Sequence, residues 1–131
     1  MEQTKNEPTK ENKAALAESH CEDMIDRNFF AHNTPDGQTP FDRMKAAGIS
    51  YSSAGENIAA GQYSPQNVMD SWMNSPGHRK NILNPDFEYL GVGLARGGSY
   101  GIYWAQEIFM AAGYGVSDVL MNIVVTGREM R

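Results

Sequence analysis

The most marked shortage in this chain of 131 residues is cysteine, because Cys21 stands alone. A single thiol cannot form an internal disulfide, so packing has to hold the fold together. No apolar run is long enough to span a bilayer, and there is no internal repeat. Positive charge is also scarce, and the net charge of −5 argues against nucleic acid as a partner. The length suits one domain with one core.

The N-terminal residues are polar. Residues 1–12 are rich in Glu, Lys, Thr and Asn, a composition that cannot bury enough apolar surface to order itself, so we expect a flexible tail. Met1-Glu2-Gln3-Thr4 does not lead into an apolar stretch, so no signal peptide is recognised. The protein is therefore either cytoplasmic or begins after a removed leader.

The first half of the chain has helical patterns. Apolar residues at three- and four-residue spacing predict an amphipathic helix from Lys13 to about Asn28, with Cys21 on its apolar face as a buried, inert thiol. A second helix is expected from the capping residue Thr39 to Gly48. Two more are expected, one after Ser64-Pro65 and a short one from Ser75 through Leu83.

The second half has strand patterns. Apolar and small residues alternate on both sides of the turn Gly97-Gly98-Ser99, which predicts an antiparallel hairpin. Val119–Val125 is a further β-prone run. Helices followed by a hairpin indicate an α+β domain.

Three segments carry the residue types of a metal or general-base site. They are Phe29-Phe30-Ala31-His32, Gly55-Glu56-Asn57-Ile58-Ala59, and the stretch from Trp72 to Leu83 that contains His78. Each residue also has a purely structural interpretation. His32 could be a histidine at a helix C-terminus, Glu56 a buried carboxylate that holds loop amides, and His78 a loop brace. At the start of a short helix, His78 should stay neutral near pH 7.

The same three segments resemble the CAP/SCP superfamily, which includes cysteine-rich secretory proteins, insect venom antigens and plant pathogenesis-related proteins. The likeness is to the bacterial, secreted branch and runs from about Leu16 to Phe109. It implies a three-layer α-β-α sandwich with a central antiparallel sheet. On this basis residues 13–110 form the domain, and residues 111–131 are a C-terminal extension that the resemblance does not cover.

The resemblance assigns His32 and Glu56 to a His/Glu tetrad that lines a cleft. Two positions depart from the animal and plant pattern: Tyr103 stands where the second tetrad histidine is expected, and Ser75 where the second glutamate is expected. Tyr103 and Gln106, from the corresponding motif, are expected in the cleft. His78 is the bacterial-type histidine. Glu107 aligns with neither missing member.

If His32, Glu56 and His78 converge, a Zn²⁺-like ion could take two nitrogens, one oxygen and a water. The resemblance implies an extracellular or cell-surface protein whose cleft binds a divalent cation or a small ligand, peptide or glycan. A metal-dependent hydrolase acting on peptide or cell-wall material is one alternative, and a structural or interaction module is another. Catalysis stays open because no serine has a nucleophile-elbow context, and a pairing of Glu56 with Glu107 would be arbitrary.

Two further expectations concern the rest of the chain. Bacterial relatives usually begin with another helix, in the place of the polar tail here. We expect Val116–Val125, or a second copy of the chain, to cover the core face that this helix would cover. His20 lies beside the apolar face of the first predicted helix, so we expect it at the surface or its boundary and assign it no role.

Overall fold

The computed structural model describes residues 10–111 and 122–125. Within these residues four helices and four strands follow one another: α1 Lys10–Asp26, α2 Pro40–Ala46, β1 Tyr51–Ala60, α3 Pro65–Met73, α4 Pro76–Leu83, β2 Tyr89–Gly97, β3 Gly101–Ala111 and β4 Asn122–Val125. The helix α1 begins three residues before the predicted start at Lys13. The rest of the predicted tail, residues 1–9, lies outside the described residues.

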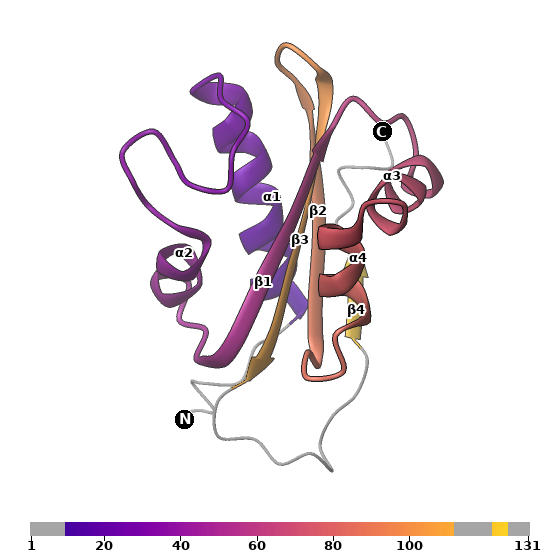
Figure 1. Ribbon diagram of the computed structural model, residues 1–131. Helices are drawn as coiled ribbons and strands as arrows, with labels where there is room; N and C mark the ends of the chain where they lie inside the picture. The colour runs from indigo at the N-terminus through magenta and orange to yellow at the C-terminus, as the bar shows by residue number, and fades with distance from the viewer. Residues whose placement is uncertain (1–9, 112–121, 126–131) are drawn as a thin grey trace.

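The sheet is the middle of three layers. Helices α1 and α2 lie on one face of it, and α3 and α4 lie on the other (Figure 1). The strand order is β1-β3-β2-β4, and β3 pairs antiparallel with both β1 and β2. The predicted α-β-α sandwich is therefore confirmed. One pairing differs from the expectation, because β4 lies parallel to β2 at the sheet edge.

The strand β4 falls within the β-prone run Val119–Val125. It takes an edge position beside Tyr89–Val92 of β2. The prediction that Val116–Val125 covers a core face concerns mostly residues outside the described ones. Most of the predicted extension, residues 111–131, also lies outside them.

Local signals set the helix boundaries as predicted. Thr39 and Asp42 form a reciprocal capping box at α2, in which each side chain accepts a hydrogen bond from the other residue's backbone N–H. Ser64 caps α3 through the Asn67 amide. Both helices carry proline at their start, where its missing N–H costs nothing.

Apolar side chains pack on both faces of the sheet. On the α1 side the core contains Ala17, Cys21, Met24, Tyr103 and Ala105. Cys21 is fully buried, as predicted, and burial raises the pKa of its thiol well above the usual value. On the other face Val68 and Trp72 of α3 pack on Leu94 and Trp104.

The helix α1 approaches β2 unusually closely at two glycines. A Cβ on Gly91 would lie 2.4 Å from the Lys13 carbonyl oxygen, and one on Gly93 would lie 2.6 Å from the Glu18 amide nitrogen. The obstacle is helix backbone, which cannot rotate away as a side chain can. The glycines of this strand therefore set the distance between the helix and the sheet.

We expect Gly93→Ala to lower the free energy of unfolding by about 2 kcal/mol or more, because α1 must move away from the sheet. Gly77→Ala is the matched control. A Cβ at Gly77 meets nothing within 4 Å, so alanine should be neutral or stabilising in α4. Urea denaturation of both variants measures the difference. Equal midpoints for the two variants would show that the close approach of α1 to β2 does not restrict the size of the side chain at position 93.

Candidate functional site

A buried carboxylate is the centre of the candidate site. Glu56 lies on β1 and is 6% exposed, directly opposite Glu107 of β3, which is completely buried. Burying an ionised carboxylate is costly unless charged and polar partners surround it. Such partners are present: His32, which the family resemblance groups with Glu56, and Arg43, which the sequence interpretation does not single out.

Two cationic or potentially cationic groups bind the two oxygens of Glu56. Arg43 of α2 donates from Nη2 to Oε2 at 2.5 Å, and His32 lies with Nδ1 2.8 Å from Oε1. Arg43 also donates from Nη1 to the His32 carbonyl oxygen at 2.8 Å. One guanidinium therefore ties the loop before α2 to the edge strand β1.

The His32 side chain is 50% exposed, whereas that of Glu56 is only 2% exposed. An ionised carboxylate can only accept, so Nδ1 of His32 must carry the hydrogen of this bond. In the neutral imidazole, Nε2 is then an acceptor. The arrangement fixes the ring and leaves half of its surface accessible to a ligand.

His20 is the third histidine of the site, and the expectation that it lies at the surface is wrong. It is 1% exposed, its Nε2 is 2.9 Å from the Ala31 carbonyl oxygen, and the same atom is 3.9 Å from Oε1 of Glu56. The loop that contains Ala31 covers the side of α1 on which His20 lies, which helical spacing alone would leave exposed to solvent. Burial lowers the pKa of His20, so its ring is neutral at pH 7.

The two glutamates have opposite pKa shifts. Burial by itself would raise the pKa of Glu56, but the hydrogen bonds that it accepts and the positive charge of Arg43 outweigh burial and lower it. Burial and the neighbouring negative charge raise the pKa of Glu107 well above the usual value. Among the described residues, neither Glu107 oxygen has a hydrogen-bond partner of standard geometry. Its raised pKa makes Glu107 a neutral acid opposite the Glu56 carboxylate in the strand pairing.

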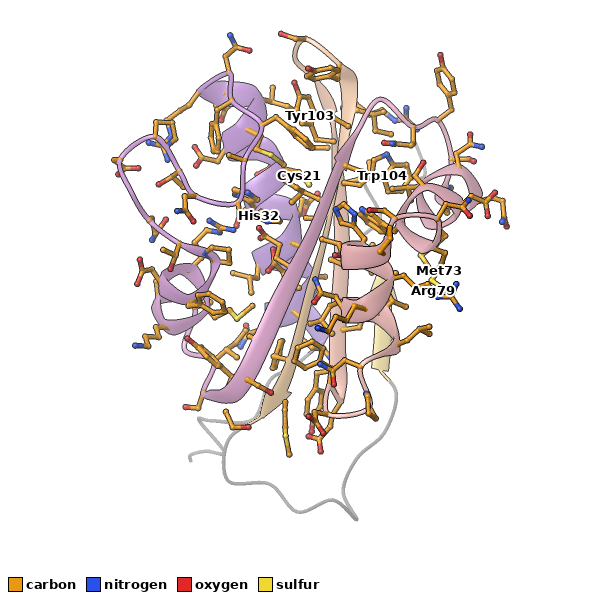
Figure 2. All side chains as sticks on the ribbon, viewed as in Figure 1. Cys21, His32, Met73, Arg79, Tyr103 and Trp104 are labelled. Atoms are coloured by element: carbon orange, nitrogen blue, oxygen red, sulfur yellow. The ribbon has the colours of Figure 1, made fainter. Side chains whose placement is uncertain are left out.

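His32 and His78 meet in one groove, which we call the histidine section. It has a volume of about 440 Å³ and is lined by Phe30, Ala31, His32, Ile58, Ala59, Ala60, Gln62, Ser71, Trp72 and His78. The groove crosses the edge strand β1, with His32 on the α1–α2 side (Figure 2) and His78 on α4. Glu56 is not among the lining residues, because it lies buried behind His32.

The expectation that His78 is neutral agrees with its pKa, which burial lowers. Ser75 is the N-cap residue of α4, but its side chain makes no hydrogen bond to the helix backbone. Its Oγ instead lies 2.8 Å from Nδ1 of His78. The cap residue therefore orients the imidazole.

Asn57 supports His78 from the sheet. It donates from Nδ2 to the His78 carbonyl oxygen at 3.2 Å and to the Gln106 side chain at 2.9 Å. Its own oxygen accepts from Asn81 of α4 at 3.0 Å. These bonds fix α4 against β1 and β3.

Tyr103 and Gln106 do not line the histidine section, and the expectation that they do is corrected. They are three residues apart on a strand and so point to opposite faces of the sheet. Tyr103 is 1% exposed in the core beside α1, and Gln106 is 2% exposed beneath α3 and α4. Figure 2 shows Tyr103 and Trp104 on the two sides of the sheet.

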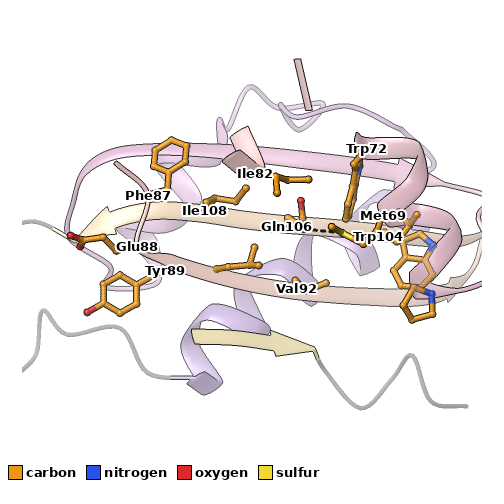
Figure 3. Close-up of a pocket in the computed structure, with 13 residues that line it drawn as sticks. Met69, Trp72, Ile82, Phe87, Glu88, Tyr89, Val92, Trp104, Gln106 and Ile108 are labelled. Atoms are coloured by element: carbon orange, nitrogen blue, oxygen red, sulfur yellow. Dashed lines mark hydrogen bonds between the residues drawn. The ribbon is translucent and has the colours of Figure 1, made fainter. Parts of the chain in front are cut away.

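Gln106 instead lines a different cavity of about 330 Å³, between α3 and strands β2 and β3 (Figure 3). Its walls are mostly apolar, with Met69, Trp72, Val92, Trp104 and Ile108 among them. The Gln106 amide donates toward the Met69 sulfur at 3.7 Å. None of the three predicted metal ligands lines this cavity.

The predicted three-ligand metal set is not assembled. Within residues 10–111 and 122–125, no three or more His, Cys, Asp or Glu side chains are grouped to hold a metal ion. Both oxygens of Glu56 are already occupied by Arg43 and His32, and a guanidinium beside the carboxylate repels a cation. The residues present therefore do not fit a zinc centre built on His32, Glu56 and His78.

The sequence interpretation missed Arg43 and set Glu107 aside. Arg43 lies one position before the buried Met44 on α2, where helical spacing alone does not predict an inward charge. Glu107 did carry a signal, since it lies on the same strand face as Tyr103, Ala105 and Phe109, all of which point into the core. A carboxyl in such a row is expected to be buried and protonated.

Comparison with known proteins identifies the family. The pattern of the cysteine-rich secretory protein (CAP) family matches residues 11–108. This chain belongs to that family. The CAP domain of the chain is 54% identical over 95 residues to YkwD of Bacillus subtilis, an uncharacterized protein, covering 72% of this chain and 35% of YkwD.

Solved structures agree with the fold. An extracellular protein containing an SCP domain from Bacillus anthracis superposes with a TM-score of 0.65 at 38% identity, over 76% of this chain and 32% of that one. An outer surface protein from Borrelia burgdorferi gives a TM-score of 0.70 at 19% identity, over 77% of this chain and 74% of that one. The chain thus spans about a third of YkwD and of the B. anthracis protein. No helix among the described residues has the length and apolarity needed to cross a membrane.

We expect the stability contribution of Glu107 to decrease as the pH rises. Its folded-state pKa is raised, so between the unfolded value of about 4.3 and the folded value the native state binds more protons than the unfolded state. Glu107→Gln, which mimics the neutral acid, should be more stable than the wild type at pH 7, with the difference shrinking toward pH 4. Thermal unfolding of both proteins from pH 4 to pH 8 measures this. Parallel curves would show that the pKa of Glu107 is the same in the folded and unfolded proteins.

We expect Arg43→Met to lower the free energy of unfolding by about 3 kcal/mol or more, because it leaves the buried Glu56 charge without its ion-pair partner. Adding Glu56→Gln should recover part of the loss, since the uncompensated charge is then removed. Arg79→Met, at an exposed position of α4, is the control and should change little. Urea denaturation checks all three. An unchanged Arg43→Met midpoint would contradict the ion pair.

Proposed function

We propose that this CAP domain is a secreted binding module whose histidine section takes a small, uncharged ligand, and that it does not catalyse a reaction there. The observation that supports this is the accessible His32 imidazole held on the buried Glu56 by Arg43. A structural brace alone has no need of a ring that is half exposed. The extracellular location is carried over from the B. anthracis relative, which is an extracellular protein.

The chemistry of the groove favours a neutral ligand with both polar and apolar parts. Two imidazoles supply hydrogen-bonding nitrogens, and their proximity disfavours a proton on both. Phe30, Ile58 and Trp72 supply apolar walls. Small-molecule sites commonly combine apolar walls with a few placed polar groups.

The same geometry argues against hydrolysis. A glycosidase needs two carboxyl groups beside its substrate, but Glu56 is saturated by its partners and Glu107 is completely buried. Among the residues that line the histidine section there is no carboxylate at all, and Ser71 is the only hydroxyl nucleophile. Ser71 has no hydrogen bond to His32 or His78 that would activate it.

A ligand-observed NMR screen tests the proposal with three probe classes: N-acetylated amino sugars, short uncharged peptides and neutral acyl detergents. We expect one class to bind and to shift the imidazole resonances of both His32 and His78. His32→Ala should weaken that binding about tenfold or more, because it removes a preorganised polar group. Phe41→Ala, which changes an exposed ring of α2 outside the groove, should leave it unchanged.

Two results would contradict this function. One is binding that persists in both His32→Ala and His78→Ala, which would place the ligand elsewhere. The other is a stoichiometric Zn²⁺ complex, seen by calorimetry and lost in His32→Ala, that hydrolyses any of the probes. That second result would favour the metal-dependent hydrolase.

A further inference from the structure

The histidine section continues into a second hollow. This hollow has a volume of about 730 Å³ and is lined by Ala60, Gly61, Gln62, Tyr63, Asn67, Asp70, Ser71 and Asn74. Ala60, Gln62 and Ser71 line both hollows, so the two are contiguous. We call the second hollow the amide section, because three of its side chains are carboxamides.

Each section carries an exposed aromatic ring. Tyr63, in the amide section, is 86% exposed, and Phe30, in the histidine section, is 46% exposed. Phe30 also meets Tyr100 of the hairpin turn, with ring centroids 6.2 Å apart. Large exposed rings at both sections offer flat apolar surfaces beside polar groups.

The polar groups of the amide section are almost all uncharged. Asp70 is its one acid, and that carboxylate already accepts from Gln66 at 2.9 Å. No lysine or arginine lines either section, so neither is built for a phosphate or a carboxylate ligand. The Gln62 side-chain oxygen has no hydrogen-bond partner among the described residues, although it lies where the two sections join.

An extended peptide is the less suitable occupant of this groove. It would bind best by adding a strand to the outer edge of β1. Two carbonyl groups of that edge are already used, because Trp72 donates to Ile58 at 3.1 Å and Asn81 donates to Glu56 at 3.4 Å. An acyl chain would likewise gain little from a hollow lined by amides and hydroxyls.

We propose that the two sections form one continuous site for a neutral oligosaccharide that carries acetamido groups; this rests on the binding function proposed above. A pyranose ring has apolar faces of C–H groups and a rim of hydroxyls. The exposed rings of Phe30 and Tyr63 match those faces. The carboxamides of Gln62, Asn67 and Asn74 can both donate to and accept from hydroxyl and acetamido groups.

Isothermal titration calorimetry with the β-1,4-linked tetramer of N-acetylglucosamine tests this on the full chain, with the glucose tetramer as the probe that lacks acetamido groups. We expect binding of the first and at least tenfold weaker binding of the second. Tyr63→Ala should weaken the acetylated tetramer about fivefold to tenfold. Gln62→Leu should weaken it as well, while its backbone oxygen still accepts from Trp104.

Phe41→Ala is the matched control, because that ring is 43% exposed on α2 and lines neither section. Wild-type affinity in Tyr63→Ala and Gln62→Leu would overturn the extended site. The extended site would also be overturned if the tetramer failed to bind while another probe class shifted the imidazole resonances of His32 and His78. That result would leave the proposed binding function intact. If no probe shifts either histidine, both proposals fail together.

Discussion

The arrangement of this domain depends on how one negative charge is buried. Glu56 sits on the edge strand of the sheet, beneath a loop, and its carboxylate is almost inaccessible. Such a charge is tolerated only when its partners are held in place. Arg43 comes from α2, His32 comes from the loop before it, and His20 of α1 lies 3.9 Å away, so three elements meet at one carboxylate. Those contacts fix the loop that forms one wall of the groove.

The protonation of the adjacent Glu107 determines the net charge of this buried region. With Glu107 neutral, the negative charge of Glu56 faces the single positive charge of Arg43, so the two buried charges balance each other. If both glutamates were ionised, two like charges would face each other across a strand pair, which is unfavourable. The burial of Glu107 thus keeps it away from the groove and from any chemistry there.

Much of the fold was predictable because its signals are local. Caps at Thr39 and Ser64, prolines at helix starts and alternation along the hairpin depend on neighbouring residues only. The family resemblance then supplied the layer order and the contact between His32 and Glu56. The features that the sequence did not predict depend on tertiary contacts. Helical spacing did not show that Arg43 points inward, and the loop at Ala31 buried a histidine that its helix position left at the boundary.

Strand alternation by itself corrects part of the sequence prediction. It places Tyr103 and Gln106 on opposite faces of the sheet, so the two side chains cannot line one cleft together. The same alternation put Glu107 among core residues. The parallel addition of β4 was less predictable, since nothing in a short β-prone run states which strand it will join or in which direction.

The two edges of the sheet differ in a way that affects how copies of this domain behave in solution. Trp72 fills the core beneath α3 and also occupies the Ile58 carbonyl, while Asn81 occupies the Glu56 carbonyl. An edge strand with occupied carbonyl groups is a poor template for a strand of a neighbouring molecule. The indole ring therefore discourages aggregation through β1, and the opposite edge, beside β2, is where the sheet has accepted a further strand.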